Sequence, residues 1–287
     1  MIDPTLWAFL TFVVLIGGSS VAIRYTYSQL PVFWSGASRF GLSAVIFWLL
    51  VLLRRVELPR GPALTGATLF GVVSIGGGLS LYYWGLEKTP ASLFQIIGAV
   101  GPLLTLFFAV LHGQERLRPR TIFGALLVIA GITVAFGGTV SGELSLIRIL
   151  SVVAGAALLA EASVLVKHYP PSHPIATSAI GLSIGSSMMA LFSLLAGETW
   201  VLPSGSAMWW AFGYLVIGPS VISFLLYLHV LQRWTASATA YGLVLTPLIT
   251  VVLAATLADE RITGVFLAGA LLVLCGVWFG AMMNRRG

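Results

Sequence analysis

Residues 91–111 read ASLFQIIGAVGPLLTLFFAVL, a stretch without a single charge. About 20 mostly apolar residues are enough for one helix to cross the hydrocarbon core of a membrane. Ten such segments can be read along the chain, at 5–23, 32–53, 64–86, 91–112, 121–138, 148–166, 175–196, 207–231, 236–257 and 263–283. The pattern therefore predicts an all-α membrane protein with ten transmembrane helices.

The composition agrees with a chain that lipid must cover. Hydrophobic residues make up 58% of the sequence, charged residues 8%, and the mean hydropathy is +1.01, whereas a soluble domain carries about 25% charged residues. The net charge of +6 comes from short basic clusters between apolar blocks, which indicate membrane topology rather than a nucleic-acid partner. Cys275 is the one cysteine, so no disulfide can form within the chain.

The basic residues are distributed unequally between the two sides of the predicted bundle. Cytoplasmic loops retain an excess of lysine and arginine during insertion. The side opposite the termini has four basic loop residues, Arg24, Lys88, Arg148 and Arg261. The side that holds both termini has ten, namely Arg54, Arg55, Arg60, Arg116, Arg118, Arg120, Lys167, Arg233, Arg285 and Arg286. Both termini are therefore predicted to be cytoplasmic.

The second half of the chain repeats the first. At a shift of 145 positions, Tyr82 matches Tyr227, and the stretch 91–111 matches 236–256, which reads ASATAYGLVLTPLITVVLAAT. The pair Glu115-Arg116 matches Glu260-Arg261 at the same shift. Nearer the start of each half the likeness is thinner, and Ser20-Val21 matches Ser163-Val164 at a shift of 143.

The repeat also predicts how the halves are oriented. Each half, 1–142 and 143–287, holds five predicted spans, and an odd number of crossings reverses the chain, so the two copies should be inverted in the membrane. Inverted halves recur in secondary transporters, whose substrate site lies near the midplane between them. Alternating-access transport is the leading hypothesis; a stable bundle produced by duplication, or a passive channel with two similar halves, remains an alternative.

The order of motifs also resembles a known family, the EamA-type branch of the drug/metabolite transporter superfamily. The likeness begins with Trp7, the stretch 17–22, Leu30-Pro31 and Arg39-Phe40, and continues in each half through the aromatic third span, the central proline of the fourth and the glycine-rich fifth. Within that superfamily the chain is most similar to amino-acid exporters, including the aromatic amino acid and paraquat exporter group. The resemblance implies export of a small metabolite across a bacterial inner membrane, without a cofactor, by a monomer or homodimer.

Glycine and proline mark positions where helices are expected to be softened. The third span contains Gly76, Gly77 and Gly78, and the eighth contains Gly218 and Pro219 near the same depth of the repeat. Softened helices expose backbone groups that can bind polar ligands or act as hinges, although close helix packing also favours glycine. Matched prolines in the fourth and ninth spans, Pro102 and Pro247, are predicted to kink their helices.

Several uncharged side chains are candidates for substrate contact. Gln95, Ala99 and Pro102 would lie along one face of a continuous helix, and Gln95 is the best polar contact unless it bonds a neighbouring helix. The repeat partners Tyr82 and Tyr227, with Tyr241, offer an apolar ring and a hydroxyl to an organic substrate. The alternative for these tyrosines is the membrane interface.

The clearest charges inside predicted spans are Arg39 and Glu161, and exposing either to lipid would be expensive. Arg39 and Glu161 should therefore face the interior, where each could meet a zwitterionic substrate; Arg39 could also be a structural anchor and Glu161 a cation or proton site. His229 is a weaker candidate for a proton relay.

Other motifs argue against an enzyme. The chain has no GxxxxGK[ST] loop and no HExxH, and the GxSxG at 181–185 falls inside a predicted span, where helix packing explains it better. We therefore expect no catalytic residue and no bound metal. The sequence predicts export of a small metabolite, an amino acid in the first instance, through a cavity lined by spans three, four, eight and nine, while spans five and ten pack against neighbours. The alternative substrates are drugs and organic cations.

Overall fold

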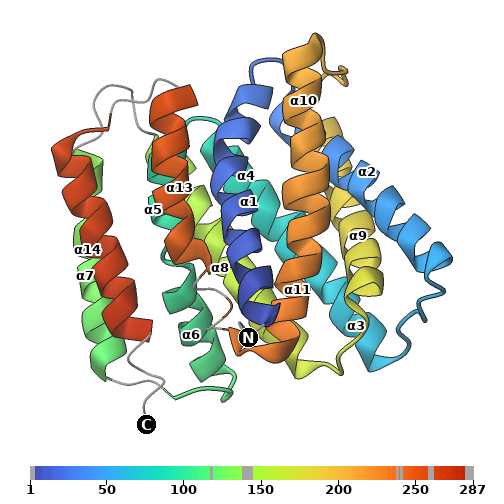
Figure 1. Cartoon of the computed structure of the whole chain (residues 1–287), viewed down its shortest axis with the longest axis horizontal. Coiled ribbons are helices and arrows are strands. Elements are labelled where there is room, and N and C mark those ends of the chain that lie inside the picture. Colours follow the sequence, from blue (N-terminus) through green and yellow to red (C-terminus); the bar gives the residue numbers. More distant parts are fainter. Residues whose placement is uncertain are drawn as a thin grey trace.

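A computed structural model describes residues 4–116, 119–137, 145–236, 239, 242–257 and 262–281. Every regular element in these residues is helical. The helices run side by side as one bundle (Figure 1). This is the arrangement that lipid requires, because a helix pairs its own backbone donors and acceptors.

The helices of the first half, in chain order, are α1 (Pro4–Thr26), α2 (Val32–Leu53), α3 (Pro62–Leu69), the π-helix η1 (Phe70–Leu79), α4 (Ser80–Leu86), α5 (Ala91–Gly98), α6 (Gly101–Leu111) and α7 (Pro119–Gly137). Those of the second half are α8 (Leu146–His168), α9 (Pro174–Leu195), α10 (Ser206–Leu215), the π-helix η2 (Val216–Ile222), α11 (Ser223–Arg233), α13 (Gly242–Leu257) and α14 (Gly264–Ala281).

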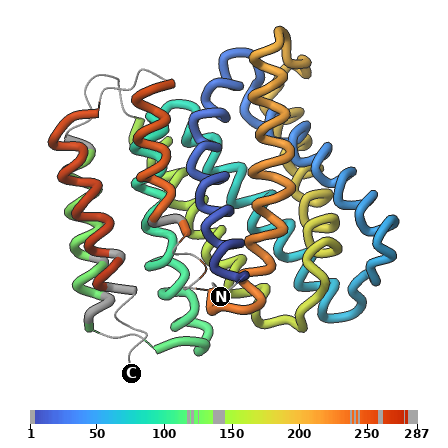
Figure 2. The backbone as a smooth tube through the Cα atoms, in the orientation of Figure 1, coloured from blue at the N-terminus to red at the C-terminus, as the bar shows by residue number. Residues whose placement is uncertain are grey.

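The predicted spans coincide with these helices or with stacks of them. In the described part of the chain, seven helices or helix stacks are long and apolar enough to cross a membrane. They cover residues 4–26, 32–53, 62–86, 91–111, 146–168, 174–195 and 206–233. Three shorter apolar helices cover 122–135, 245–257 and 264–276. The helices alternate in direction, and α1 begins on the side of the bundle where α14 ends (Figures 1 and 2).

The two halves are interlocked rather than placed side by side. The first helix of each half packs mainly against the other half: α1 lies against α13, α11 and α10, and α8 lies against η1, α4 and α6. Corresponding helices also meet directly, α2 with α9 and α7 with α14. A rigid unit of this bundle therefore need not coincide with one half of the sequence.

The predicted softened positions lie in the two π-helices. Gly76, Gly77 and Gly78 belong to η1, and Gly218 and Pro219 belong to η2. A π-helix is wider than an α-helix and is usually short. Pro219 has no N–H to donate, and beside it the Ser220 hydroxyl donates to the Leu215 carbonyl at 2.8 Å.

The matched prolines do not act alike. Pro247 lies inside α13, as predicted. Pro102 does not kink a continuous helix, because the fourth span is broken at Ala99 and Val100 and Pro102 lies in the first turn of α6. A proline is tolerated there, since the first N–H groups of a helix have no intrahelical partner.

Glycines bring several helices into backbone contact. A Cβ atom added to Gly131 of α7 would lie 2.7 Å from the Gly269 carbonyl oxygen of α14. Gly71 and Gly181 bring η1 and α9 equally close, and Ser183 of the GxSxG sequence accepts a hydrogen bond from Trp48 Nε1 at 2.9 Å. The prediction that spans five and ten pack against neighbours is confirmed, since α7 and α14 pack on one another.

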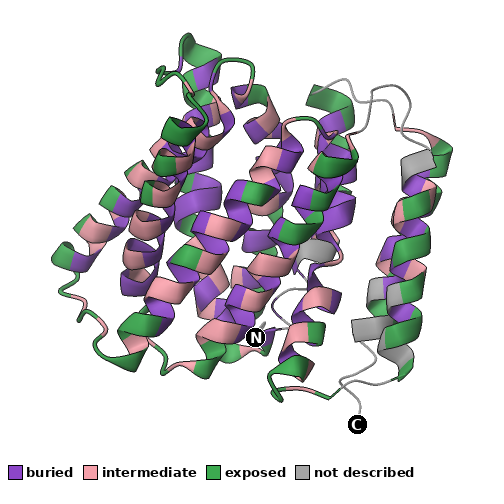
Figure 3. Cartoon of the chain, turned by 180° about the vertical axis from the view of Figure 1, so that it is seen from behind, coloured by how far each residue is buried: buried purple, intermediate pink, exposed green. Residues whose placement is uncertain are grey.

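Burial follows the pattern expected of a bundle in lipid. Buried residues lie between the helices and exposed ones on their outer sides (Figure 3). Large apolar side chains on the outside are highly exposed, for example Leu53 at 78% and Trp210 at 80%. A water-soluble protein rarely shows contiguous apolar surface of this kind, so we assign these surfaces to lipid.

We predict that Gly131→Ala destabilises the protein by about 1–3 kcal/mol, because the new methyl group meets backbone atoms that cannot rotate away. Thermal unfolding in detergent should show a lower melting temperature. Gly213→Ala is the matched control, since nothing lies within 4 Å of a Cβ added there. Equal melting temperatures for the two variants would contradict the packing of α7 against α14.

Candidate functional site

A cavity lies at the centre of the bundle, between helices of both halves. The space open to the centre of a water molecule is about 150 Å³. Its lining residues are Phe12, Ile16, Ser19, Phe40, Phe70, Ser74, Leu79, Tyr82, Tyr83, Phe94, Gln95, Gly98, Gly101, Thr105, Ala156, Leu159, Ala160, Ser163, Pro219, Ser220, Ser223, Phe224, Tyr227 and Thr239. The predicted spans three, four, eight and nine all contribute, and so do α1, α2 and α8.

The lining is aromatic and uncharged. Phenylalanine and tyrosine rings dominate the described wall, and its polar groups are serine, threonine and tyrosine hydroxyls and the Gln95 amide. Pockets of this kind bind organic molecules through apolar contact and orient them with a few polar groups. The Ser223 hydroxyl is buried and has no hydrogen-bond partner among the residues that the structure describes, so it is a donor and acceptor that a ligand could satisfy.

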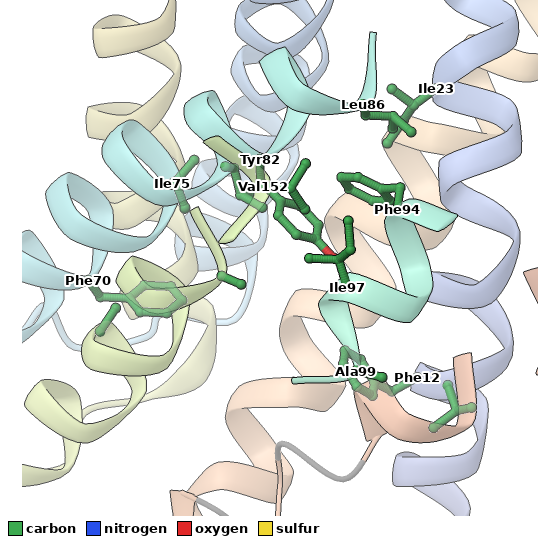
Figure 4. Packing of buried hydrophobic residues seen from close by; sticks show 14 of the residues in the cluster. Phe12, Ile23, Phe70, Ile75, Tyr82, Leu86, Phe94, Ile97, Ala99 and Val152 are labelled. Carbon is green, nitrogen blue, oxygen red and sulfur yellow. The ribbon is translucent and has the colours of Figure 1, made fainter. Parts of the chain in front are cut away.

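Tyr82 lies on α4 and presents its hydroxyl at the broken fourth span. Its ring packs on Phe94, with 4.1 Å between ring centroids. A Cβ added to Gly98 would overlap the hydroxyl oxygen, which points toward α5 beside Ile97 (Figure 4). No hydrogen bond joins this hydroxyl to any described residue. Tyr82 is therefore at the cavity rather than at the membrane interface.

Tyr227, the repeat partner of Tyr82, faces the same cavity from α11. Its hydroxyl oxygen lies 2.5 Å from Ser163 Oγ, and its ring packs on Phe12 at 5.7 Å between centroids. The two tyrosines thus reach the cavity from opposite halves, but within the described part of the chain only the Tyr227 hydroxyl is hydrogen-bonded. Tyr241 lies outside the described residues.

The expected face of Gln95, Ala99 and Pro102 is not continuous. Gln95 lines the cavity, and its Nε2 donates to the Ile16 carbonyl at a long 3.4 Å. Ala99 and Pro102 are buried and do not line it. The break at Ala99 and Val100 ends the helical periodicity on which the prediction depended, and Gly98, Gly101 and Thr105 line the cavity instead.

Arg39 lies directly behind the aromatic wall. Its side chain is 2% exposed, and its guanidinium carbon lies 4.3 Å from the ring centroid of Phe40 and 4.9 Å from that of Tyr83. Phe40 and Tyr83 line the cavity, whereas Arg39 does not. No carboxylate among the described residues pairs with Arg39, and its Nε has no hydrogen-bond partner. A positive charge therefore stands near the cavity without a counter-ion in the part of the chain that the structure describes.

Tyr27, in the turn after α1, belongs to the same neighbourhood. Its hydroxyl donates to the Tyr83 carbonyl at 3.4 Å. Burial raises the pKa of this hydroxyl well above its ordinary value, and the nearby charge of Arg39 opposes the rise. Tyr27 thus stays a neutral hydrogen-bond donor and does not neutralise Arg39.

Glu161 lies outside the cavity. Its Oε1 is 2.8 Å from His112 Nε2, and its Oε2 is buried without a partner. An ion pair joins Arg148 to Glu87 at 2.6 Å. Both pairs attach α8 to helices of the first half, so the direct contact of Glu161 with a substrate in the central cavity, which the sequence suggested, does not fit this geometry. His229 is bonded to Arg233 of its own helix, with 3.0 Å between nitrogen atoms.

The glycines of η1 are used for packing. A Cβ on Gly76 would overlap Met188 of α9, and one on Gly78 would lie 3.3 Å from the Gly155 carbonyl oxygen of α8. In η2, Pro219 lines the cavity. The described residues hold no group of three or more His, Cys, Asp or Glu side chains that could bind a metal.

Sequence reasoning missed the cavity residues Ser163, Ser223 and Phe94. Ser163 had been matched to Ser20 by the repeat, and that match was a usable signal for a polar position. Ser223 and Phe94 carry no such signal, because their roles depend on the turn of η2 and the break after α5.

Comparison with known proteins gives the family. The EamA-like transporter family model matches residues 4–137 and again 146–281. A probable terminal-alkyne amino-acid exporter of Streptantibioticus cattleyicolor is 24% identical over 99% of this chain and 95% of its own. The uncharacterized inner membrane transporter YedA of Escherichia coli is 25% identical over 95% and 91%. The uncharacterized transporter YyaM of Bacillus subtilis is 23% identical over 93% and 90%.

A solved crystal structure shares the fold. It superimposes with a TM-score of 0.74 over 99% of both chains at 23% sequence identity. The doubled family match covers nearly all of the helices described above. The chain is therefore an integral membrane transporter that belongs to the EamA-like transporter family.

Proposed function

We propose that this protein is a secondary transporter that exports small metabolites, amino acids including aromatic ones, by alternating access through the central cavity. The observation that carries the proposal is a cavity between two halves of one repeat, reached by a tyrosine from each half. Inverted-repeat transporters place their substrate sites at such an interface and expose them to one side at a time.

The proposed topology has ten crossings, five in each of the halves 1–142 and 143–287. It is supported by the alternating direction of the helices (Figure 1), and by the excess of basic loop residues on the side where α1 begins. On this proposal both termini are in the cytoplasm of a bacterial cell, and the bundle lies in its inner membrane. One related protein is named as an inner membrane transporter.

An amino acid suits the cavity better than an organic cation does. Aromatic rings can hold an aromatic side chain, and hydroxyls and the Gln95 amide can hold polar backbone groups. Arg39 behind Phe40 favours a carboxylate: a substrate charge on the far face of that ring would be about 8 Å from the guanidinium, an interaction of about 2 kcal/mol at an effective dielectric constant of 20. One relative is named as a probable amino-acid exporter.

The second candidate is a drug or organic-cation exporter. The aromatic wall favours it, because aromatic rings attract cations through their faces. However, the described lining has no carboxylate to neutralise a cation, and Arg39 would repel one.

The test is uptake of labelled amino acids into liposomes that contain the purified protein, with and without a proton gradient. The proposal expects saturable uptake of at least one aromatic amino acid, and counterflow when the liposomes are preloaded with unlabelled substrate. If no amino acid moves under any gradient, the substrate assignment is wrong. Flux without saturation or counterflow would identify a passive channel.

We predict that Tyr82→Phe raises the KM for export about three- to tenfold, because it removes one unpartnered hydroxyl and keeps the ring that packs on Phe94. Transport kinetics in liposomes measure the change. Tyr25→Phe is the control, since Tyr25 is 49% exposed and does not line the cavity. An unchanged KM would remove the Tyr82 hydroxyl from the site.

We predict that Arg39→Met lowers the preference for an amino acid over an organic cation by tenfold or more, as expected from the loss of about 2 kcal/mol of charge discrimination. Methionine keeps the length and leaves no carboxylate unpaired, because Arg39 has no ion-pair partner among the described residues. Competition between a labelled amino acid and an aromatic cation measures the preference. Arg39→Lys keeps the charge and should keep the preference; a loss in this control equal to that in Arg39→Met would exclude a charge effect.

A further inference from the structure

The two halves carry the same serine and tyrosine pair, but only one pair is bonded. The repeat matches Ser163 with Ser20 and Tyr227 with Tyr82. Ser163 Oγ and the Tyr227 hydroxyl lie 2.5 Å apart. Among the described residues, neither the buried Ser20 Oγ nor the Tyr82 hydroxyl has a hydrogen-bond partner. The bundle is therefore asymmetric at a point where its sequence is symmetric.

The bonded pair is part of a short chain of hydrogen bonds. Ser163 Oγ donates to the Leu159 carbonyl at 2.8 Å. A hydroxyl has one proton to donate, so Tyr227 must be the donor in its bond to Ser163. The chain joins α8 to α11, toward the ends of these helices that share a side of the bundle with the start of α1 (Figure 1).

The corresponding chain in the first half is prevented from forming. The match of Leu159, at the same shift of 143, is Ile16. The Ile16 carbonyl accepts instead from Ser19 Oγ at 2.7 Å and from Gln95 Nε2 at 3.4 Å. Ser20 has thus lost the acceptor that fixes its counterpart Ser163, and Tyr82 has no oriented serine to which it could donate.

The sequence explains why the halves differ at this point. Gln95 corresponds to position 240 in the second half, which is an alanine. A glutamine that can occupy the carbonyl therefore exists in the first half alone. Its contact with Ile16 is long for a hydrogen bond, so a ligand in the cavity that Gln95 lines can compete for the amide.

We propose that Ser20 and Ser163 are positioning residues that hold Tyr82 and Tyr227, respectively, in two alternate states of the transporter. The change between these states is permitted when the Gln95 amide releases the Ile16 carbonyl. The proposal rests on the proposed function. When Gln95 turns to the substrate, it vacates one lone pair of the Ile16 carbonyl oxygen, while Ser19 keeps the other. Ser20 then donates to Ile16 and accepts from Tyr82, as Ser163 accepts from Tyr227. Because the halves are inverted, exchanging their arrangements moves the closed side of the cavity to the opposite face of the membrane.

The energies involved suit a reversible exchange. Hydrogen bonds between transmembrane helices contribute little each, about 0.6 to 1.4 kcal/mol. Loss of one such bond therefore changes the ratio of the two states about three- to tenfold. A shift of this size is measurable, and it leaves both states populated.

The experiment measures which side of the membrane reaches the cavity. Ser74, which lines the cavity, is changed to cysteine after Cys275→Ser removes the native thiol. A membrane-impermeant thiol reagent is then applied to right-side-out and to inverted vesicles without substrate. Ser163→Ala should move the labelling ratio three- to tenfold toward the side where α1 begins. Ser20→Ala should move the ratio in the opposite direction, or leave it unchanged where the unmodified protein is already labelled from the opposite side alone.

The role of Gln95 is tested in the same assay. Gln95→Ala gives the first half the residue of the second, and should shift labelling in the direction of Ser163→Ala. Adding Ser20→Ala should abolish that shift, because Ser20 can no longer use the Ile16 carbonyl. Ser187→Ala is the control, since Ser187 bonds only a carbonyl of its own helix, and it should not change labelling.

Two results would overturn the proposal: no shift in Ser163→Ala, or a Gln95→Ala shift that survives Ser20→Ala. Size-exclusion profiles establish that each variant is folded. Labelling requires no substrate, so its outcome is separable from the proposed function. If no amino acid is transported but the variants shift labelling as stated, the exchange stands and the substrate assignment fails.

Discussion

Lipid cannot hydrogen-bond to a peptide group, and this constraint shapes the whole chain. A backbone that leaves the α-helix within the membrane must do so inside the protein. The deviations observed here obey that rule: η1, η2 and the break at Ala99 and Val100 all lie beside the central cavity. The irregular backbone and the candidate site therefore lie in the same place, because only the interior of the protein tolerates non-helical backbone and polar groups at membrane depth.

How the freed groups are satisfied shows what holds the site together. At η2 the Ser220 hydroxyl bonds the Leu215 carbonyl next to a proline that cannot donate. The Thr250 hydroxyl bonds the Gly17 carbonyl and connects α13 to α1. The Ser220 hydroxyl thus bonds a carbonyl beside a residue that has no N–H, and the Thr250 hydroxyl joins helices of different halves. The Ser223 hydroxyl at the cavity has no hydrogen-bond partner among the described residues.

Much of the fold could be predicted from sequence, because each span must be about as long as the membrane is thick and glycine permits close approach. The spans and the packing of α7 on α14 depend only on those local facts. Ala99 and Pro102, which were expected beside Gln95, do not line the cavity, because the regular helix on which that prediction depended is interrupted at Ala99 and Val100. Arg39 and Glu161 were both expected in the interior of the bundle. Nothing in the sequence shows that aromatic rings separate Arg39 from the cavity, or that His112 pairs with Glu161.

Two polar side-chain contacts of α8 also change which parts of the bundle can move together. Arg148 with Glu87 and Glu161 with His112 tie α8 to the first half near both of its ends, and α1 packs mainly on the second half. Each rocking unit would then consist of the later helices of one half together with the first helix of the other half. With the first helices exchanged in this way, the bond between Ser163 and Tyr227 joins α8, which moves with the first half, to α11, which moves with the second half. A bond across that boundary breaks when the units rotate, whereas a bond within a unit would not report the motion at all.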